Sequence, residues 1–279
     1  MIKHTNQQAI EHAALLISDA DGLIITAGAG MGVDSGLPDF RGNQGFWQAY
    51  PALANKQIDF MSMANPQAFR KNPNLAWGFY GHRLALYRGT LPHVGFSILK
   101  TLGGTLSGGT FVVTSNVDGQ FQKAGFSEKS ILEIHGTINL CQCFEPCKED
   151  IWSAAGLNPA VDESSCQWLG PLPECPHCQS IARPNILMFG DSAWLESHFL
   201  EQEAYWRKWR KTVKRPVVIE LGAGVDIPSI RHFSERQESP LIRINPRDDA
   251  LSKVNVGVSI SMGAKDALIA IAQELDLNF

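Results

Sequence analysis

The sequence predicts an α/β protein with a Rossmann-like parallel sheet, helices on both faces, a small zinc-binding module and a helical or loop lid insertion. Three observations support this prediction. Short apolar runs alternate with helical patterns, a glycine-rich segment follows the first apolar run, and all six cysteines lie between Cys141 and Cys178. Alternating strands and helices form parallel sheets that are covered on both faces. A chain of 279 residues is long enough for one such core and a small insertion.

The first elements are predicted to be a helix, a buried strand and a tight loop. Thr5 can cap a helix whose apolar residues share one face, and the turn at residues 21–22 ends it. Residues 23–27 form a short apolar run that predicts a buried strand. The strand opens into Gly28-Ala29-Gly30, where the backbone can approach a ligand phosphate at a helix start. The same glycines could instead form only a tight turn from strand to helix.

The glycine segment does not complete the standard dinucleotide-binding pattern. That pattern needs a glycine at position 33, where this chain has Val33. A hydride-transferring dehydrogenase is therefore not supported.

The rest of the sheet and its covering helices follow from hydrophobic periodicity. Further apolar runs predict strands at residues 111–113, 131–134, 217–221, 241–244 and 254–260. Helical patterns occur at residues 74–87, 194–211 and 264–275. We expect a nucleotide-binding domain formed by residues 1–40, 88–140 and 184–279.

Two segments interrupt this pattern. Residues 41–87 are predicted to form a lid and the helical part of a small domain. Their first part, residues 41–69, is rich in aromatic residues and methionines, and it fits either a mobile lid or a well-packed loop. In residues 141–183, cysteines, prolines and polar residues replace the apolar periodicity. This second segment is the predicted zinc-binding module.

Charge and hydropathy exclude some classes of partner. The formal net charge of −4 gives no overall attraction to phosphate backbones or anionic lipids. No stretch approaches the roughly 18 apolar residues that a membrane span requires. We expect a cytoplasmic protein with no membrane partner, and nucleic acid is not the expected partner. A basic stretch at residues 207–215 follows three aromatic residues and could contact nucleic acid, but it also fits a solvated helix whose acidic residues come first.

Four motifs resemble those of the sirtuin family and occur in the family's order. Residues 28–42, GAGMGVDSGLPDFRG, resemble the signature GAGxSxxSGIPDFR, and residues 114–118 with Ala124-Gly125 resemble TQNIDxLHxxAG. His135-Gly136 lies where the family's catalytic histidine is expected, and residues 183–191, RPNILMFGD, resemble RPxVVxFGE. Together the motifs cover most of the chain.

The resemblance implies an NAD-dependent protein lysine deacylase. In this chemistry the acyl-lysine oxygen attacks the ribose carbon that bears nicotinamide, and the acyl group passes to ADP-ribose. The resemblance makes His135 the base that activates a ribose hydroxyl, and it places Asn116 and Asp118 in the nicotinamide pocket. His135 also follows the predicted strand at residues 131–134, where ligand crevices form, and an imidazole titrates near neutrality.

The resemblance also implies where NAD and the acylated lysine of a protein or peptide bind. Asp39 would hydrogen-bond near the nicotinamide, and Phe40 and Arg41 would position the sugar. The substrate would lie as an extended segment along Ile186, Leu187 and Phe189. The full set of expected NAD-binding residues is Gly28, Ala29, Gly30, Asp39, Phe40, Arg41, Ser115, Asn116, Asp118, Gly222, Ala223, Gly224, Asn245 and Ala264.

The resemblance also indicates that acyl groups ending in a carboxylate are accepted as well as acetyl. Tyr80 and Arg83 match the YxxR element of sirtuins that remove succinyl and malonyl groups. Residues three apart share a helix face, and a guanidinium with a phenol can bind a carboxylate. The alternative is an ordinary helix with Arg83 in a surface ion pair.

Two close pairs of cysteines are predicted to bind a structural zinc ion, namely Cys143, Cys147, Cys175 and Cys178. Four thiolates make a closed tetrahedral site with no open position for catalysis. The second pair also fits a redox CxxC pattern, although no helical periodicity follows it. Cys141 could compete with Cys143, but Cys143 stands at the family's usual distance from the histidine. Cys166 has no assigned role.

The sequence departs from the family at the NAD pocket. Ser115 replaces a glutamine, Gly32 replaces a serine, and the segment 222–228 lacks the hydroxyls of the family's GTSxxVxP. Two alternatives therefore stay open. One is an NAD glycohydrolase or protein ADP-ribosyltransferase, and the other is a non-catalytic sensor of NAD or ADP-ribose.

Overall fold

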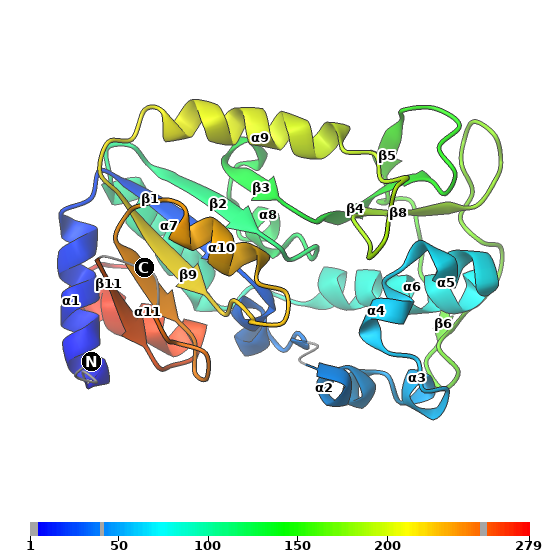
Figure 1. The fold of residues 1–279 in the computed structure, drawn as a ribbon, viewed down its shortest axis with the longest axis horizontal. Coiled ribbons are helices and arrows are strands. Elements are labelled where there is room, and N and C mark those ends of the chain that lie inside the picture. Colours follow the sequence, from blue (N-terminus) through cyan, green and yellow to red (C-terminus); the bar gives the residue numbers. More distant parts are fainter. Residues whose placement is uncertain (1–4, 40–41, 252–255) are drawn as a thin grey trace.

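A six-stranded parallel sheet forms the core of the larger part of the molecule, on the left in Figure 1. The computed structural model describes residues 5–39, 42–251 and 256–279. The strand order is β11-β10-β9-β1-β2-β3, and every neighbouring pair is parallel. In chain order the strands are β1 (Gly22–Ala27), β2 (Thr110–Thr114), β3 (Ile131–Glu133), β9 (Pro216–Leu221), β10 (Leu241–Ile244) and β11 (Gly257–Ile260).

The sheet is buried on both faces, as its continuous apolar runs predict. Every residue of β1 and of β9 is buried. On one face the core includes residues of α1 (Asn6–Ser18), α7 (Val94–Thr105) and α11 (Ala264–Glu274). On the other face, α9 (Ser197–Arg210) and α10 (Ser229–Glu235) pack against a smaller core that contains Trp206. The predicted doubly covered parallel sheet is confirmed.

The order of the strands reverses between β1 and β9. From β1 the chain moves outward through β2 to β3, whereas from β9 it moves in the opposite direction through β10 to β11. Ligands of open α/β sheets bind in the crevice beyond the carboxyl ends of the strands at such a reversal. The strand order therefore predicts a ligand-binding crevice at the loops that follow β1 and β9.

The segment between β1 and β2 carries a series of helices rather than an irregular loop. They are α2 (Gly42–Ala49), α3 (Pro51–Asn55), α4 (Phe60–Met63), α5 (Pro66–Lys71) and α6 (Pro73–Gly89). Proline at the first turn starts α3, α5 and α6, and the side chains of Asp59, Asn65 and Asn72 cap α4, α5 and α6. The helices α2 to α5 are too short to show a helical period in the sequence, whereas the longer α6 agrees with the helix predicted at residues 74–87.

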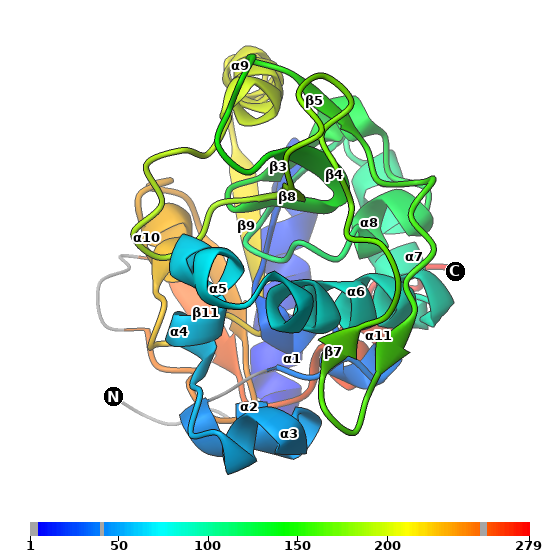
Figure 2. The same cartoon turned by 90° about the vertical axis from the view of Figure 1, so that its right-hand side faces the viewer.

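These helices pack against two small sheets at one end of the molecule, which Figure 2 faces. A three-stranded sheet has the order β5-β4-β8, and β6 pairs with β7. The shared core contains Phe46, which is fully buried, together with Phe69, Trp77 and Trp168. The described part of the segment, residues 42–69, therefore fits the well-packed alternative better than the mobile lid. The strands are β4 (Gly136–Cys143), β5 (Ile151–Ser153), β6 (Val161–Asp162), β7 (Gln167–Trp168) and β8 (Ala182–Ile186).

Among the described residues, no helix combines the length and the apolar character needed to cross a membrane.

Candidate active site

Two glycine loops meet where the strand order reverses. Ala27 at the end of β1 lies opposite Leu221 at the end of β9. The amide of Gly28 donates to the Leu221 carbonyl (3.0 Å), and the amide of Gly30 donates to the Gly222 carbonyl (3.1 Å). A Cβ atom at Gly30 would lie only 2.7 Å from the Gly222 Cα. Glycine is required at this contact because the two backbones touch.

The residues after β1 form two single 3-10 turns, η1 (Ala29–Met31) and η2 (Val33–Ser35), instead of the expected helix start. The second turn ends at Gly36, whose φ of 87° is in the left-handed region. Asp34 in this turn accepts a hydrogen bond from the Lys265 amide (2.9 Å) at the start of α11. The glycine segment is thus held against α11 as well as β9.

A pocket opens to solvent beside these turns, with about 390 Å³ of space. It extends from the ends of β1, β9 and β10 to the start of α11. At its rim an Arg247 guanidinium nitrogen lies 3.9 Å from an Asp39 carboxylate oxygen. Its lining residues are Gly30, Val33, Asp34, Asp39, Gly222, Ile244, Pro246, Arg247, Gly263 and Ala264.

Sequence reasoning missed several of these lining residues. Pro246 and Arg247 belong to none of the four motifs, and Asp34 stands at a position that the first motif leaves unspecified. Only the order of the strands brings these residues together. One feature of the sequence could have indicated Arg247: it comes two residues after Asn245, just beyond the strand predicted at residues 241–244. Phe40 and Arg41, which were expected to hold the sugar, lie outside the described residues.

Asn245 organises the loop after β10. Its side chain is fully buried and donates to the Ala223 carbonyl (3.0 Å). Its side-chain oxygen accepts from the amides of Arg247 (3.1 Å) and Asp248 (3.0 Å). Its predicted contact with the nucleotide stays a prediction, whereas its role in joining the loops after β9 and β10 is evident from these bonds.

Asn116 lies at the end of β2 and reaches the glycine loop. Its side-chain amide donates to the Gly28 carbonyl (3.0 Å), and its backbone amide donates to the Thr114 hydroxyl (3.0 Å). The neighbouring Ser115 donates its amide to the Ala27 carbonyl (3.1 Å). These bonds place Asn116 beside the crevice and fix the orientation of its carboxamide.

Asp118 is a partly buried carboxyl close to the same strand end. It accepts a hydrogen bond from the Gln120 amide (2.9 Å), which starts the short helix α8 (Gln120–Lys123). Burial raises the pKa of Asp118 to about 6, and the charge of Glu133 acts in the same direction. The positive charge of Arg83 opposes this shift. Asp118 is therefore mostly ionised at neutral pH and gains a proton near pH 6.

His135 follows β3, the next strand of the sheet. Burial lowers the pKa of His135, although a hydrogen bond with the backbone of Ser115 acts in the opposite direction. The imidazole is thus neutral at pH 7 and can accept a proton. The His135 carbonyl accepts from the Leu187 amide (2.9 Å), which joins this strand end to the segment after β8. The structure therefore brings His135, Ser115 and Asn116 together at adjacent strand ends.

The segment expected to hold the substrate follows β8. Ile186 is buried, Leu187 is 38% exposed, and Phe189 packs edge-on against Phe60 with ring centroids 6.1 Å apart. A fully buried ion pair between Arg183 and Asp191 (2.6 Å) closes the turn. This closure holds the exposed Leu187 next to the backbone of the histidine.

Tyr80 and Arg83 lie on α6 inside the core of the small domain. Arg83 is 7% exposed, so the alternative of a surface ion pair is wrong. Its Nε donates to the Tyr87 hydroxyl (2.8 Å), and its guanidinium lies 5.2 Å from the centroid of the Phe79 ring. The buried Tyr80 hydroxyl has no hydrogen-bond partner among the described residues. Arg83 thus places a buried positive charge beside the Tyr80 hydroxyl, which can still donate a hydrogen bond.

The four predicted zinc ligands converge in space. The sulfur atoms of Cys143, Cys147, Cys175 and Cys178 all lie within 4.8 Å of one another. Two sulfur pairs are separated by 3.6 and 3.7 Å. Zinc–sulfur bonds of 2.3 Å in a tetrahedron place the sulfurs about 3.8 Å apart, so the site fits zinc. Cys141 and Cys166 instead pack in the apolar core of the small domain.

The two tryptophans of the basic helix α9 face the sheet, whereas Tyr205 is half-buried and its hydroxyl donates to Glu201. Trp206 is 9% exposed and packs against Phe111, and the Trp209 indole donates to the Gly108 carbonyl (2.7 Å). Arg207 pairs with Glu203 on the same helix (2.9 Å). Base stacking on these tryptophans would require them to leave the core. The solvated helix is therefore the better interpretation.

A model of the Sir2 family matches residues 28–219. The chain is 28% identical over 252 residues to an NAD-dependent protein deacylase of Thermococcus sibiricus, covering 88% of each protein. It is 26% identical over 244 residues to NAD-dependent protein deacylase 1 of Archaeoglobus fulgidus, covering 85% of this chain and 86% of that relative. A solved Sir2 homologue in complex with NAD shares the fold with a TM-score of 0.71 and 22% identity, covering 98% of this chain and 95% of that chain.

Proposed function

Since the chain belongs to the Sir2 family, we propose that it is an NAD-dependent protein lysine deacylase that transfers the acyl group to ADP-ribose and releases nicotinamide. The observation that carries this proposal is the convergence of Asn116 and His135 at adjacent strand ends beside the paired glycine loops. The relatives that match most of the chain are named as deacylases of this kind.

The crevice has features that suit NAD. Gly30 and Gly222, which meet where the two glycine loops touch, also line the open pocket beside them, so a diphosphate could approach the main chain there without meeting a side chain of either residue. Gly222 and Ala264 would lie along the adenosine half of the pocket, and Asn116 and Asp118 along the nicotinamide half. NAD would supply an electrophilic sugar carbon with nicotinamide as the leaving group.

His135 would act as the general base. Its lowered pKa keeps the imidazole neutral at pH 7, so it can take a proton from a sugar hydroxyl without first losing one. The hydrogen bond with the backbone of Ser115 orients the ring. Correct placement of such a base contributes typically 10²- to 10⁴-fold to the rate.

Asn116 and Asp118 would bind and orient the nicotinamide amide. The Asn116 carboxamide is fixed by its bond to Gly28, which leaves its oxygen as an acceptor. The Asp118 carboxylate is mostly ionised at neutral pH and stabilises positive charge that develops on the sugar. The aromatic packing of Phe60 and Phe189 limits access of water to the substrate side, and water would otherwise hydrolyse NAD.

The zinc site has a structural role in this proposal. Four thiolates fill the tetrahedron, so no position remains for a reacting water. Cys143 ends β4 and the other three ligands lie in loops, so the metal joins segments that have little regular structure.

The enzyme would also accept acyl groups that end in a carboxylate. Arg83 supplies a buried positive charge, and its Nε donates to the Tyr87 hydroxyl (2.8 Å). A succinyl carboxylate could accept a hydrogen bond from Tyr80 while pairing with this charge. Arg83→Met should therefore lower kcat/KM for a succinyl peptide at least tenfold more than for an acetyl peptide. The exposed Arg70→Met serves as the control, and equal losses on both peptides would contradict acyl recognition by Arg83.

The proposed activity is tested by product analysis. Protein and NAD are incubated with acetyl-lysine and succinyl-lysine peptides, and the nucleotide products are identified by mass spectrometry. A deacylase yields free lysine, nicotinamide and acyl-ADP-ribose in equal amounts. Plain ADP-ribose without loss of the acyl group would identify a glycohydrolase, an ADP-ribosylated protein would identify a transferase, and binding without turnover would identify a sensor.

A further inference from the structure

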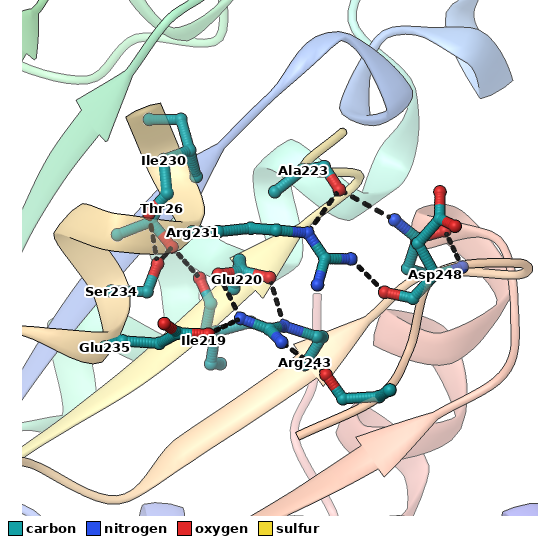
Figure 3. Close-up of polar contacts among 12 residues, drawn as sticks. Thr26, Ile219, Glu220, Ala223, Ile230, Arg231, Ser234, Glu235, Arg243 and Asp248 are labelled. Atoms are coloured by element: carbon teal, nitrogen blue, oxygen red, sulfur yellow. Dashed lines mark hydrogen bonds and ion pairs between the residues drawn. The ribbon is translucent and has the colours of Figure 1, made fainter. Parts of the chain in front are cut away.

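A cluster of four charged side chains lies behind the nucleotide pocket, between β9, β10 and α10 (Figure 3). Arg243 on β10 is 1% exposed and donates to both carboxylate oxygens of Glu220 on β9, at 2.5 and 3.1 Å. It also donates to Glu235 on α10 (3.1 Å). Arg231, one turn earlier on α10, completes the cluster. Three of the four members thus form a compact, charge-paired group.

The hydrogen bonds of Arg231 go to main-chain carbonyls, whereas Arg243 donates to two carboxylates and also to the Ala250 carbonyl in the loop after β10. The Arg231 Nε donates to the Ala223 carbonyl (3.3 Å), and another guanidinium nitrogen donates to the Asp248 carbonyl, as Figure 3 shows. Ala223 belongs to the glycine loop after β9, and Asp248 belongs to the loop after β10. A single planar guanidinium therefore joins two loops that are distant in sequence.

Both of these loops line the pocket. Gly222 comes from the first loop, and Pro246 and Arg247 come from the second. The separation between the two loops sets the width of the pocket at its adenosine end. Any side chain that fixes this separation controls how well the pocket is preorganised for a nucleotide.

Charge pairing alone does not account for Arg231 at this position. Burial lowers the pKa of Arg231, and the positive charge of Arg243 lowers it further, although Glu220 and Asp248 act in the opposite direction. Burying this guanidinium beside Arg243 therefore has a cost, which the carboxylates of Glu220, Asp248 and Glu235 offset in part. The hydrogen bonds to the two loop carbonyls add a further compensating interaction.

We propose that Arg231 is a positioning residue, which holds the loops after β9 and β10 at the separation that the adenosine half of the nucleotide requires. The inference rests on the proposed function in taking NAD and ADP-ribose as the ligands. Loss of the Arg231 side chain leaves the Ala223 carbonyl bonded to Asn245 but removes the guanidinium from Asp248. The second loop, which carries Pro246 and Arg247, then moves more freely.

The test compares Arg231→Met with Arg231→Lys and with Arg236→Met, an exposed arginine at the end of the same helix. Calorimetry measures the Kd for ADP-ribose. Arg231→Met should weaken binding about tenfold, the equivalent of one hydrogen bond to a charged group. Arg231→Lys should give an intermediate loss because one ammonium on a flexible stem reaches one carbonyl and not both. Arg236→Met should bind as the wild type does.

Two further measurements separate positioning from general damage. The KM for NAD should rise with the Kd, while kcat at saturating NAD should change by less than about twofold. Hydrogen exchange of residues 245–251 should accelerate in Arg231→Met without any ligand present. The proposal would be overturned if Arg231→Met left the Kd unchanged, or if it lowered kcat and thermal stability in parallel. Unchanged hydrogen exchange in residues 245–251 would also overturn it. Wild-type protein that fails to bind ADP-ribose would instead overturn the proposed function, whatever the exchange data show.

Discussion

Replacing Asp118 with asparagine should stabilise the protein above pH 6 while impairing NAD cleavage. Burial raises the pKa of this carboxyl from 3.8 to about 6 in the folded protein. The folded state thus keeps the proton up to about pH 6, whereas the unfolded chain releases it near pH 3.8. Between these values the folded state binds more protons, so the free energy of unfolding falls as the pH rises. Above pH 6 the full cost of burying the charge is present.

The size of the effect follows from the same shift. About two pH units correspond to about 3 kcal/mol at 1.36 kcal/mol per unit. This value is an upper bound, because the side chain is only partly buried. Asparagine has nearly the same shape, does not titrate and can still accept the hydrogen bond from the Gln120 amide. At pH 5 the stabilisation should shrink to about half of its value at pH 8.

The assay is urea denaturation of the wild type and Asp118→Asn at pH 5 and pH 8, with NAD cleavage measured in parallel. Asp59→Asn is the matched control, because hydrogen bonds from Ser62 lower the pKa of Asp59 and leave no burial cost to relieve. The variant at position 118 should be more stable than the wild type at pH 8 and less active. Equal stability of the two proteins at pH 8, or a gain that is larger at pH 5, would refute the reasoning.

Three further outcomes are expected. Because burial lowers the pKa of His135, the acidic limb of kcat/KM for NAD should have its midpoint below the ordinary histidine value of 6.5; a pH–rate profile with a midpoint above 6.5 would contradict this. Cys175→Ser should lose the bound zinc, measured by metal analysis, and lower the melting temperature, whereas Cys166→Ser outside the cluster should retain the metal; retention of zinc by both variants would exclude the four-cysteine site. Gly30→Ala should destabilise the protein by about 1–3 kcal/mol because the new Cβ meets the Gly222 backbone. The exposed helical Gly104→Ala, whose Cβ meets nothing within 4 Å, should be neutral or stabilising in the same denaturation assay.

The central sheet could be predicted because its strands are continuous apolar runs buried on both faces. The covering helix α7 was missed, since Gly95, Gly103 and Gly104 weaken its helical pattern. Gly103 is needed there for packing, because a Cβ would lie 2.6 Å from the Thr110 side chain. The helices between β1 and α6 were also missed, because elements of four to eight residues are too short to show a period of 3.6.

The site was predictable where a residue follows a strand or belongs to a spaced motif. Asn116 was predicted through the motif that resembles the family's, and His135 also because it comes directly after an apolar run. Adjacent parallel strands bring the two residues to one edge of the sheet. Arg231 and Arg247 could not be found in this way. Their relevance depends on the reversal of strand order between β1 and β9, which places loops distant in sequence beside one pocket. No local pattern distinguishes them from ordinary surface arginines.

A crystal structure with ADP-ribose and an acyl-lysine peptide tests the central claim most directly. The measurement is the distance from the His135 imidazole to the nearest hydroxyl of the ribose that carries nicotinamide in NAD. We expect a hydrogen-bond distance below about 3.2 Å, with the acyl oxygen facing the same sugar. An imidazole directed away from that ribose, or a nucleotide bound outside the crevice between the glycine loops, would contradict the proposed mechanism.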